Sequence, residues 1–247
     1  MDRSLFISMS GAKETLLAQA IVTSNLANAD TVGFKADFEQ FRSLPVFGPG
    51  YPSRVYALTE RPATEFNSGS IHTTGRELDI AIDGEGWLAV QAPDGSEAYT
   101  RRGDLQLSPQ GLLQTGDGLA VLGQNGPIAI PPAQKLEIAP DGTISIVPLG
   151  AKPDVSAVID RIKLVRPSPE QLEKGQDGLI RLKNGGTANA DASVALIPGA
   201  LENSNVNSVQ ALVEMIELAR RFELQIQMMK TAEEDSQASS KLLRIGG

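Results

Sequence analysis

The chain has 247 residues, of which 41% are hydrophobic, and it carries a net charge of −8 at pH 7 with no cysteine. This length suffices for one large domain or two smaller ones with a substantial core. The acidic balance argues against a nucleic-acid partner, because binding to phosphate backbones needs clustered Lys and Arg. The absence of cysteine excludes disulfides and thiolate chemistry. No run approaches the ~18 consecutive apolar residues of a membrane span, so we expect no membrane insertion.

The N-terminal segment, residues 4–28, has the spacing of an amphipathic helix. Its seam alternates between steps of four and three residues, which is the pattern of a coiled coil. Polar residues interrupt this seam, so an ordinary amphipathic helix packed on a neighbouring domain stays as the alternative. The seam positions are Leu5, Met9, Ala12, Leu16, Gln19, Thr23 and Leu26.

A sharp turn is expected directly after this helix. Asn28 and Asp30 can hydrogen-bond to their own backbone and tolerate left-handed conformations, while Gly33 permits a positive φ. From residue 38 to residue 74 the pattern loses periodicity, and prolines and glycines gather between Pro45 and Pro52. We therefore expect an extended connector without regular structure there, either an arm that contacts neighbouring molecules or a merely tolerated surface loop.

From Glu77 onward the period changes to two, which predicts β structure. Leu78, Ile80 and Ile82 alternate with less apolar residues, as in a half-buried strand. Pairs of Asp or Asn with Gly, which favour tight hairpin turns, then recur between short apolar runs. The middle of the chain is therefore predicted to be a domain of short antiparallel strands. The pairs begin at Asp83, Asp94, Asp117, Asn125 and Asp141.

Few residues in the sequence are candidates for catalysis or for binding a metal or a sugar. His72 has no Cys and no second His to share a transition metal with. Asp79 and Asp83 would share one strand face and could serve a glycosidase, but solvated aspartates beside turns explain them more simply. Trp87 could stack on a sugar, yet it is better explained as a core anchor. We predict no catalytic residue, no metal ligand and no cofactor.

The C-terminal segment, residues 207–243, predicts a second and longer helix. Asn207 and Gln210 make a capping box at its start. The helix would run to roughly 55 Å, whereas a compact globule of this length would be about 45 Å across, so its seam needs a partner. The N-terminal helix is the best candidate. The seam positions are Leu212, Met215, Ala219, Phe222, Ile226 and Met229.

Three motifs resemble a known family. The run from Ser24 to Lys35 resembles the Asn-rich signature that closes the first helix in flagellar rod, hook and hook–filament junction proteins. Residues 202–207 resemble the second hallmark, before the C-terminal helix, and the block from Gly75 to Trp87 is similar to the central motif. The three motifs occur in the order expected for the family, and together they cover essentially the whole chain.

This resemblance implies an α+β fold in which a discontinuous helical coiled-coil domain, residues 1–33 and 203–247, flanks a central mainly antiparallel β domain, residues 75–202. Residues 34–74 would form the connecting arm. It also implies a non-enzymatic structural subunit of the basal-body rod, which transmits torque and encloses the export channel. Leu88 after Trp87 and the sequence from Ala219 to Glu223 favour the proximal rod. The alternatives are a distal rod subunit and a β-rich carbohydrate-binding or carbohydrate-cleaving protein with helical oligomerisation segments.

The resemblance further implies partners and a location. The partners would be neighbouring rod subunits, copies of the same chain, and the flagellar export apparatus during secretion. Met1–Ser4 lack the regions of a cleaved secretory signal, so we expect export to the periplasm-spanning rod without one. The expected assembly interface consists of Leu5, Met9, Ala12, Leu16, Asn25, Leu26, Asn28, Gly33, Phe34, Asn205, Val206, Leu212, Met215, Ala219, Phe222, Ile226 and Met229.

Overall fold

The computed structural model describes residues 4–45, 55–150 and 156–245. They divide into two compact units, each made of separate chain segments. The helical unit comprises Met1–Asn28, Ala36–Glu65 and Val206–Gly247, and the β unit comprises Ala29–Lys35 and Phe66–Asn205. The predicted α+β fold, with helices at both ends of the chain and a central antiparallel β region, is confirmed. The domain boundaries drawn from the sequence stay a prediction.

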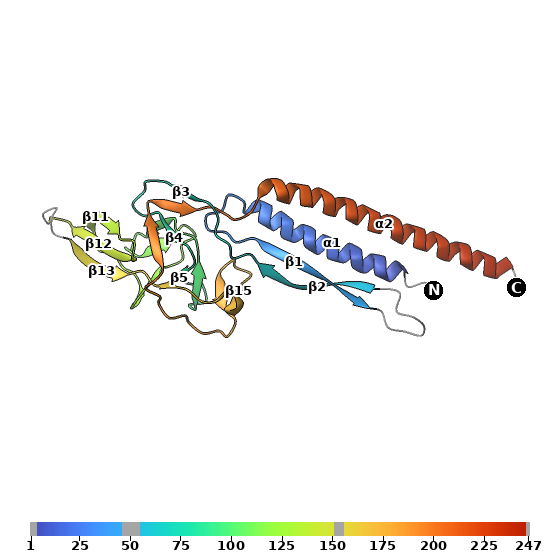
Figure 1. The fold of residues 1–247 in the computed structure, drawn as a ribbon, viewed down its shortest axis with the longest axis horizontal. Coiled ribbons are helices and arrows are strands. Elements are labelled where there is room, and N and C mark those ends of the chain that lie inside the picture. The colour runs from blue at the N-terminus through green and yellow to red at the C-terminus, as the bar shows by residue number, and fades with distance from the viewer. Residues whose placement is uncertain (1–3, 46–54, 151–155, 246–247) are drawn as a thin grey trace. The chain divides into compact units, whose positions relative to one another are not determined.

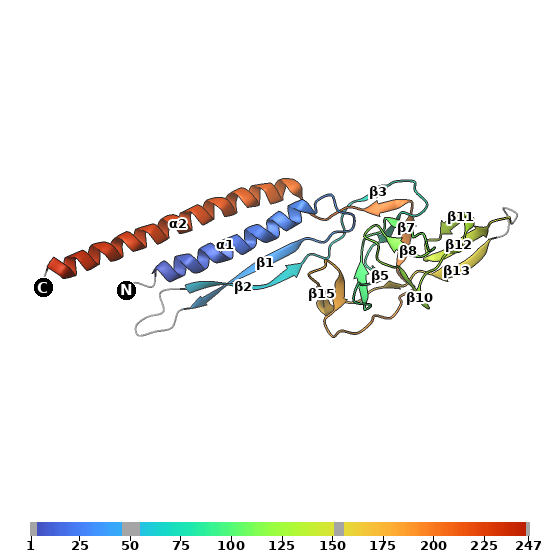
Figure 2. The same ribbon diagram turned by 180° about the vertical axis from the view of Figure 1, so that it is seen from behind.

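Two helices, α1 (Ser4–Ala27) and α2 (Ser208–Ile245), lie side by side in the helical unit (Figures 1 and 2). The side chain of Asn207 accepts hydrogen bonds from the N–H groups of Val209 and Gln210, each at 3.1 Å, so Asn207 caps α2 as its position in the sequence predicts. The paired arrangement satisfies the expected need of the long helix for a partner. Supercoiling of the two helices stays a prediction.

The face of α2 that meets α1 differs from the predicted seam by one position in every other turn. Ala211 and Leu218, rather than Leu212 and Ala219, are the most buried positions. Met215 belongs to both sets and packs on the same cluster. Apolar residues of α2 stand at neighbouring positions, such as Ala211 and Leu212, so the sequence pattern did not show which of the two faces α1. The positions turned toward α1 are Ala211, Met215, Leu218, Phe222, Gln225 and Met229.

On α1 the contact face consists of small side chains rather than the predicted large ones. Ala18 and Val22 pack with Ala211 and Leu218 of α2. A Cβ added at Gly11 would lie 3.0 Å from the Gln225 side chain, so the two helices approach closely at this level. Small residues on one helix accept larger ones from the other, which is how side-chain ridges fit grooves.

The connector expected to lack regular structure contains a β-hairpin. Strands β1 (Asp37–Pro45) and β2 (Val55–Thr64) pair antiparallel and both contact α1. The irregular expectation is therefore wrong for these residues. The glycines and prolines that suggested it, apart from Pro45, lie outside the described residues, between the two strands. In the sequence, glycines and prolines clustered between two strands resemble those of an irregular linker.

The β unit is built from short strands, and every strand pairing described in it is antiparallel. A 3-10 helix, η1 (Pro169–Gln171), interrupts the run. The strands are β3 (Ile71–Thr73), β4 (Ile80–Asp83), β5 (Trp87–Gln91), β6 (Glu97–Thr100), β7 (Leu105–Leu107), β8 (Leu113–Thr115), β9 (Leu122–Gly123), β10 (Gly126–Pro127), β11 (Ala133–Ile138), β12 (Thr143–Pro148), β13 (Ala157–Arg161), β14 (Leu164–Val165), β15 (Leu172–Lys174), β16 (Ile180–Leu182), β17 (Ala195–Pro198) and β18 (Ala200–Glu202).

The strands form several small sheets rather than one large one. The largest has five strands in the order β14-β5-β6-β16-β15, and a second has three in the order β11-β12-β13. The remaining strands of the unit pair in twos, β17 with β4, β18 with β3, β7 with β8 and β10 with β9. The glycine after each predicted Asp or Asn of a turn has a positive φ, as the hairpin turns require.

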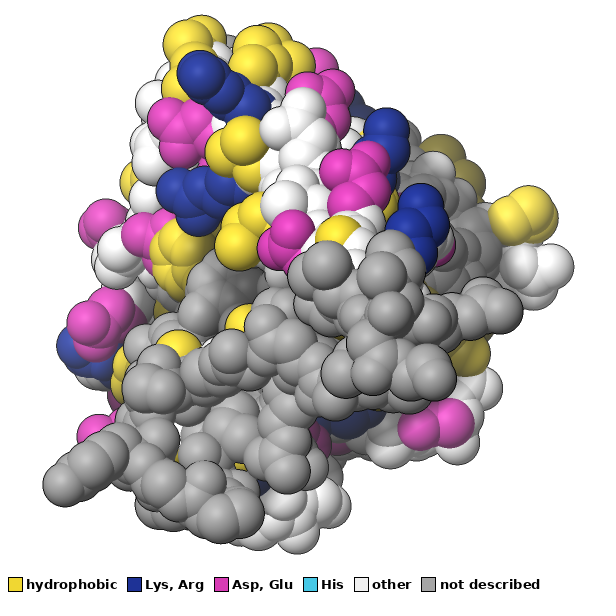
Figure 3. Space-filling view, turned by 90° about the vertical axis from the view of Figure 1, so that its right-hand side faces the viewer, with side chains coloured by type: hydrophobic (Ala, Val, Ile, Leu, Met, Phe, Trp, Pro, Cys, Tyr) yellow, Lys and Arg dark blue, Asp and Glu magenta, His cyan; other side chains and the backbone are white. Residues whose placement is uncertain are grey.

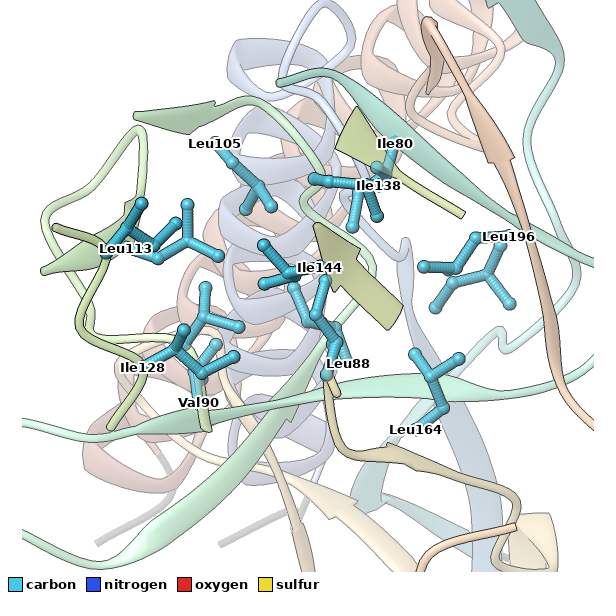
Figure 4. Packing of buried hydrophobic residues seen from close by; sticks show 14 of the residues in the cluster. Ile80, Leu88, Val90, Leu105, Leu113, Ile128, Ile138, Ile144, Leu164 and Leu196 are labelled. Atoms are coloured by element: carbon cyan, nitrogen blue, oxygen red, sulfur yellow. The ribbon is translucent and has the colours of Figure 1, made fainter. Parts of the chain in front are cut away.

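Two apolar cores hold the β unit together. The larger brings aliphatic side chains from many strands to one centre, including Leu88, Ile144 and Leu164 (Figure 4). The smaller is built around Trp87 and Tyr99. Trp87 is thus the core anchor that the sequence suggested. Burial raises the pKa of Tyr99 to about 12, so its hydroxyl remains protonated near neutral pH.

Strand β4, which the sequence predicted as half-buried, departs from that pattern. Ile80, Ala81 and Ile82 are all buried, so β4 is covered on both faces. Asp79 is buried as well, and its carboxylate accepts a hydrogen bond from the Thr74 hydroxyl at 2.7 Å. The expectation of a solvated aspartate is therefore wrong for Asp79 and holds for the exposed Asp83.

Candidate assembly surface and a buried charge cluster

One side of α1 carries large apolar side chains that are exposed to solvent. Phe6 and Met9 are 56% and 54% exposed, and Leu16 is 48% exposed. Leu5 and Leu17 lie on the same side, and Lys13 stands among them as its only cation. We call these six residues the outer face of α1.

The side of α2 that faces away from α1 is also apolar in its first turns. Val209 and Ile216 are both 70% exposed. Val213 and Leu224 belong to the same side, with the charged Arg220 and Glu223 between Ile216 and Leu224. We call these six residues the outer face of α2. Leu212, Ile226 and Met228, at the borders of this face, are exposed as well.

Helices that are apolar on several sides are normally buried on several sides. Within one chain, α1 covers only one side of α2, whereas α1 is contacted both by α2 and by the β1–β2 hairpin. Large exposed apolar patches on a folded protein mark interaction sites. Figure 3, which looks at the side of the molecule where α1 begins and α2 ends, shows hydrophobic side chains among charged ones at the surface. The outer faces of the two helices are therefore the candidate assembly surface.

The residues predicted at the assembly interface divide into two groups. Leu5, Met9, Leu16, Leu212 and Ile226 are exposed and thus free to meet another molecule. The others on the helices, together with Val206 just before α2, are buried or half-buried within the single chain. That second group contains Ala12, Leu26, Val206, Met215, Ala219, Phe222 and Met229.

The Asn-rich motif at the C-terminal end of α1 makes hydrogen bonds within the chain. The Asn25 amide donates to the carbonyl oxygen of Asp37 at 2.8 Å and accepts from its N–H at 3.0 Å, which joins α1 to β1. Asn28 donates to the carbonyl oxygen of Ser24 at 2.9 Å at the helix end. These contacts shape a single subunit, and a role of both residues in assembly stays a prediction.

The remaining predicted residues belong to the β unit. Gly33 has a φ of +67°, so the expected left-handed turn is confirmed. The ammonium group of Lys174 lies 4.1 Å from the centre of the Phe34 ring, and the Asn205 amide donates to the carbonyl oxygen of Asn67 at 3.2 Å. Here too the contacts lie within one chain, and roles in assembly stay predictions.

A buried charge cluster that the sequence analysis missed lies in the β unit. The Glu202 carboxylate accepts from the Lys35 ammonium at 2.6 Å and from the Arg101 guanidinium at 2.8 Å. The three side chains are 0%, 2% and 2% exposed. Charges so far from water are stable only when they are paired and hydrogen-bonded.

This cluster ties together segments that are distant in sequence. Glu202 also accepts from the N–H of Gly69 through its side chain, at 2.9 Å, and from the N–H of Gly33 through its backbone, at 2.8 Å. Arg101 donates to the carbonyl oxygen of Gly84 and lies over the Trp87 ring, 5.4 Å from its centre. The cluster thus anchors the segments of the β unit from which the chain passes into the helical unit.

Nothing in the spacing of these residues reveals the cluster. Glu202 lies 167 residues from Lys35 and 101 from Arg101, and a charged residue in a turn is normally solvated. The one available signal is position, because Lys35 ends the first family motif and Glu202 begins the second. From these positions the sequence permitted the hypothesis that Lys35 and Glu202 form an ion pair.

Gly33 is required where its turn touches the Arg101 backbone. A Cβ at this position would lie 2.4 Å from the carbonyl carbon of Arg101. We expect Gly33→Ala to lower the free energy of unfolding by about 3 kcal/mol or more, from left-handed strain and the clash together. Gly95→Ala is the matched control, since its φ is also positive and nothing lies within 4 Å. It should cost about 1 kcal/mol. Urea unfolding measures both, and equal losses would contradict the argument.

The β unit offers little to the rival carbohydrate chemistry. Trp87 is only 5% exposed and cannot stack on a sugar. Asp79 is buried while Asp83 is exposed, so the two carboxylates do not face a common cleft. No cluster of three or more His, Asp or Glu that could hold a metal exists among the described residues. In the described part of the chain, neither helix has the length and apolar character needed to cross a membrane.

The two ends of the chain pair as helices, and a β unit is inserted between them in the sequence. Apolar side chains remain exposed on the outer faces of both helices, which is typical of a subunit that assembles with others. Family models of flagellar proteins match three segments of the chain. Residues 5–35 match the flagella basal body rod protein model, residues 81–146 match the flagellar hook protein FlgE/F/G D1 domain, and residues 197–242 match the flagellar basal body rod FlgEFG protein C-terminal model.

Relatives of full length extend this result. The flagellar basal-body rod protein FlgF of Escherichia coli (strain K12) is 39% identical over 251 residues, covering 99% of this chain and 100% of that protein. FlgF of Salmonella typhimurium matches equally, at 39% over the same shares. FlgG of Bacillus subtilis (strain 168) is 34% identical over 267 residues, covering 99% of this chain and 100% of that protein. The chain belongs to the flagellar basal-body rod protein family, and its similarity to these FlgF proteins exceeds that to this FlgG.

Proposed function

We propose that this chain is a structural subunit of the flagellar basal-body rod, of the proximal, FlgF-like kind. Full-length identity to FlgF proteins supports this proposal above the distal-rod alternative. The single structural observation that carries it is the exposed apolar character of both helices' outer faces. Such helices reach a stable environment only when other subunits cover them.

In this proposal the protein is not an enzyme. It assembles with other rod subunits and resides in the basal body, where bundled helices transmit torque through many shared contacts. Export by the flagellar secretion apparatus, enclosure of the export channel by the assembled helices and the absence of membrane insertion belong to the same proposal. A location in the periplasm-spanning part of the motor follows from it.

A matched pair of substitutions tests the proposal. Ile216 on α2 and Val158 on β13 are 70% and 68% exposed, so replacing either with Asp should leave the free subunit folded. In a strain without the native gene, the parent chain should sediment with purified basal bodies and restore swimming. Ile216→Asp should abolish both, because it buries a carboxylate in the subunit contact, whereas Val158→Asp should retain them. A parent chain absent from basal bodies would refute the proposed function.

A further inference from the structure

Two asparagines in the chain are followed directly by glycine, Asn125 and Asn184. In such a pair the backbone nitrogen of the glycine can attack the side-chain carbonyl carbon of the asparagine, because the glycine has no Cβ to hinder the approach. Both asparagines are exposed in turns of the β unit. The two differ in how the side chain is held.

The Asn184 side chain is fixed by a hydrogen bond within its turn. Its amide oxygen accepts from the N–H of Gly186 at 3.1 Å. Rotation of this side chain toward the Gly185 nitrogen breaks that bond. The loss of one neutral hydrogen bond slows such a step about fivefold.

The Asn125 side chain has no such restraint. Asn125 lies in the turn that joins Gly123 to Gly126, which pair with each other in the β9–β10 hairpin. Within the described residues its side-chain amide has no hydrogen-bond partner. Gly126 has a φ of +118°, which favours glycine, and a Cβ placed there would meet nothing within 4 Å. The Asn125 amide therefore has open space beside the Gly126 nitrogen.

The asparagines of the two terminal family motifs are held by their own contacts. Their side chains form hydrogen bonds within the chain, and each is followed by a residue other than glycine. Reaction at these positions is therefore expected to be slower than at Asn125. The residues are Asn25, Asn28, Asn203, Asn205 and Asn207.

We propose that Asn125 is a site of spontaneous covalent modification. The Gly126 nitrogen loses its proton to water and attacks Cγ of Asn125. A bond between this nitrogen and Cγ forms, the bond between Cγ and Nδ2 breaks, and ammonia leaves. Water then opens the resulting cyclic imide at either carbonyl group, which gives aspartate or isoaspartate. Water is the only co-reactant.

The product changes a turn whose base is tightly enclosed. Either product adds a negative charge at residue 125, and isoaspartate also adds a carbon atom to the backbone of the turn. A Cβ at Gly123 would lie 2.5 Å from the Asp160 carboxylate and 2.9 Å from the Ile128 side chain, so the backbone there has little room to shift. Ile128 belongs to the larger apolar core. The modification therefore acts next to the packing of the β unit.

Incubation of the purified full-length protein at mildly alkaline pH, with samples taken over days, tests the proposal. Trypsin, which cuts after Lys and Arg, places Asn125 and Asn184 in separate peptides, 103–135 and 184–220. Replacement of the amide NH₂ by OH raises the peptide mass, and fragmentation locates the changed residue. Isoaspartate is detected with an isoaspartyl methyltransferase. A parallel incubation in urea removes the effect of folding.

In the folded protein, Asn125 should convert about fivefold faster than Asn184, because Asn184 first has to break its side-chain hydrogen bond. In urea the two should convert within about twofold of each other, since glycine follows both. Absence of conversion at Asn125 in the folded protein, or conversion at Asn184 as fast or faster, would overturn the proposal. The reaction needs no partner, so this outcome is independent of the proposed function.

Two variants show whether the Asn125 side chain itself reacts. Asn125→Gln should abolish the mass increase in peptide 103–135, because the longer side chain has to close a larger and less favourable ring. Asn184→Gln is the matched control and should leave the rate at Asn125 unchanged. A mass increase that persists in Asn125→Gln would mean that another residue of the peptide reacts, and the assignment to Asn125 would be wrong.

Discussion

Removal of the Glu202 carboxylate should destabilise the β unit more than any other single change in its charged residues. We expect Glu202→Ala to lower its free energy of unfolding by about 3–5 kcal/mol, because the substitution leaves the Lys35 and Arg101 cations buried without this carboxylate. Glu202→Gln should lose most of the same amount, since shape alone cannot compensate the charges. The N–H of Gly69 would also lose its acceptor in Glu202→Ala.

Urea unfolding followed by tryptophan fluorescence measures this effect cleanly. The chain has one Trp, Trp87, which is buried in the β unit under the Arg101 guanidinium. Glu85→Ala is the matched control, because Glu85 forms an ion pair of 2.7 Å with Arg166 at the surface, where its side chain is 79% exposed. Exposed pairs contribute about 0–1 kcal/mol. Similar losses for Glu202→Ala and Glu85→Ala would show that the buried cluster has no special weight.

Phe222→Asp should abolish incorporation into basal bodies while leaving the β unit intact. Phe222 is half-buried on the face of α2 that meets α1. Replacing it with a carboxylate removes apolar burial and places a charge between the helices, at an expected cost of about 3–5 kcal/mol. The β unit is a separate compact unit, so its thermal transition, followed at Trp87, should stay within a few degrees.

Helical circular dichroism and Trp87 fluorescence, recorded on the same sample, separate the two effects. Met228→Asp is the control, because Met228 lies nearby on α2 but is 58% exposed. It should leave the helical signal of the free subunit close to that of the parent chain. A loss of the β transition together with the helical one would mean that the two units do not fold separately.

Local features that depend on neighbouring residues were predictable from the sequence. The alternating steps of three and four residues predicted both helices, and Asn207 marked the start of α2. Asp-Gly and Asn-Gly pairs predicted the hairpin turns, because only residues that tolerate a positive φ suit them. The family motifs also required no structure, since they are contiguous stretches of the chain.

Other features depend on groups that are distant in sequence, and only the tertiary structure decided them. The seam of α2 was displaced to Ala211 and Leu218 because apolar residues stand at both neighbouring positions, Ala211 beside Leu212 and Leu218 beside Ala219, so only packing against α1 selects the face. The hairpin beside α1 was missed because its strands become regular only by pairing with each other. Glu202, Lys35 and Arg101 are ordinary charged residues until folding removes them from water together. The sequence by itself determined the elements and the family, whereas the burial of these charges and the face that each helix leaves exposed follow from packing.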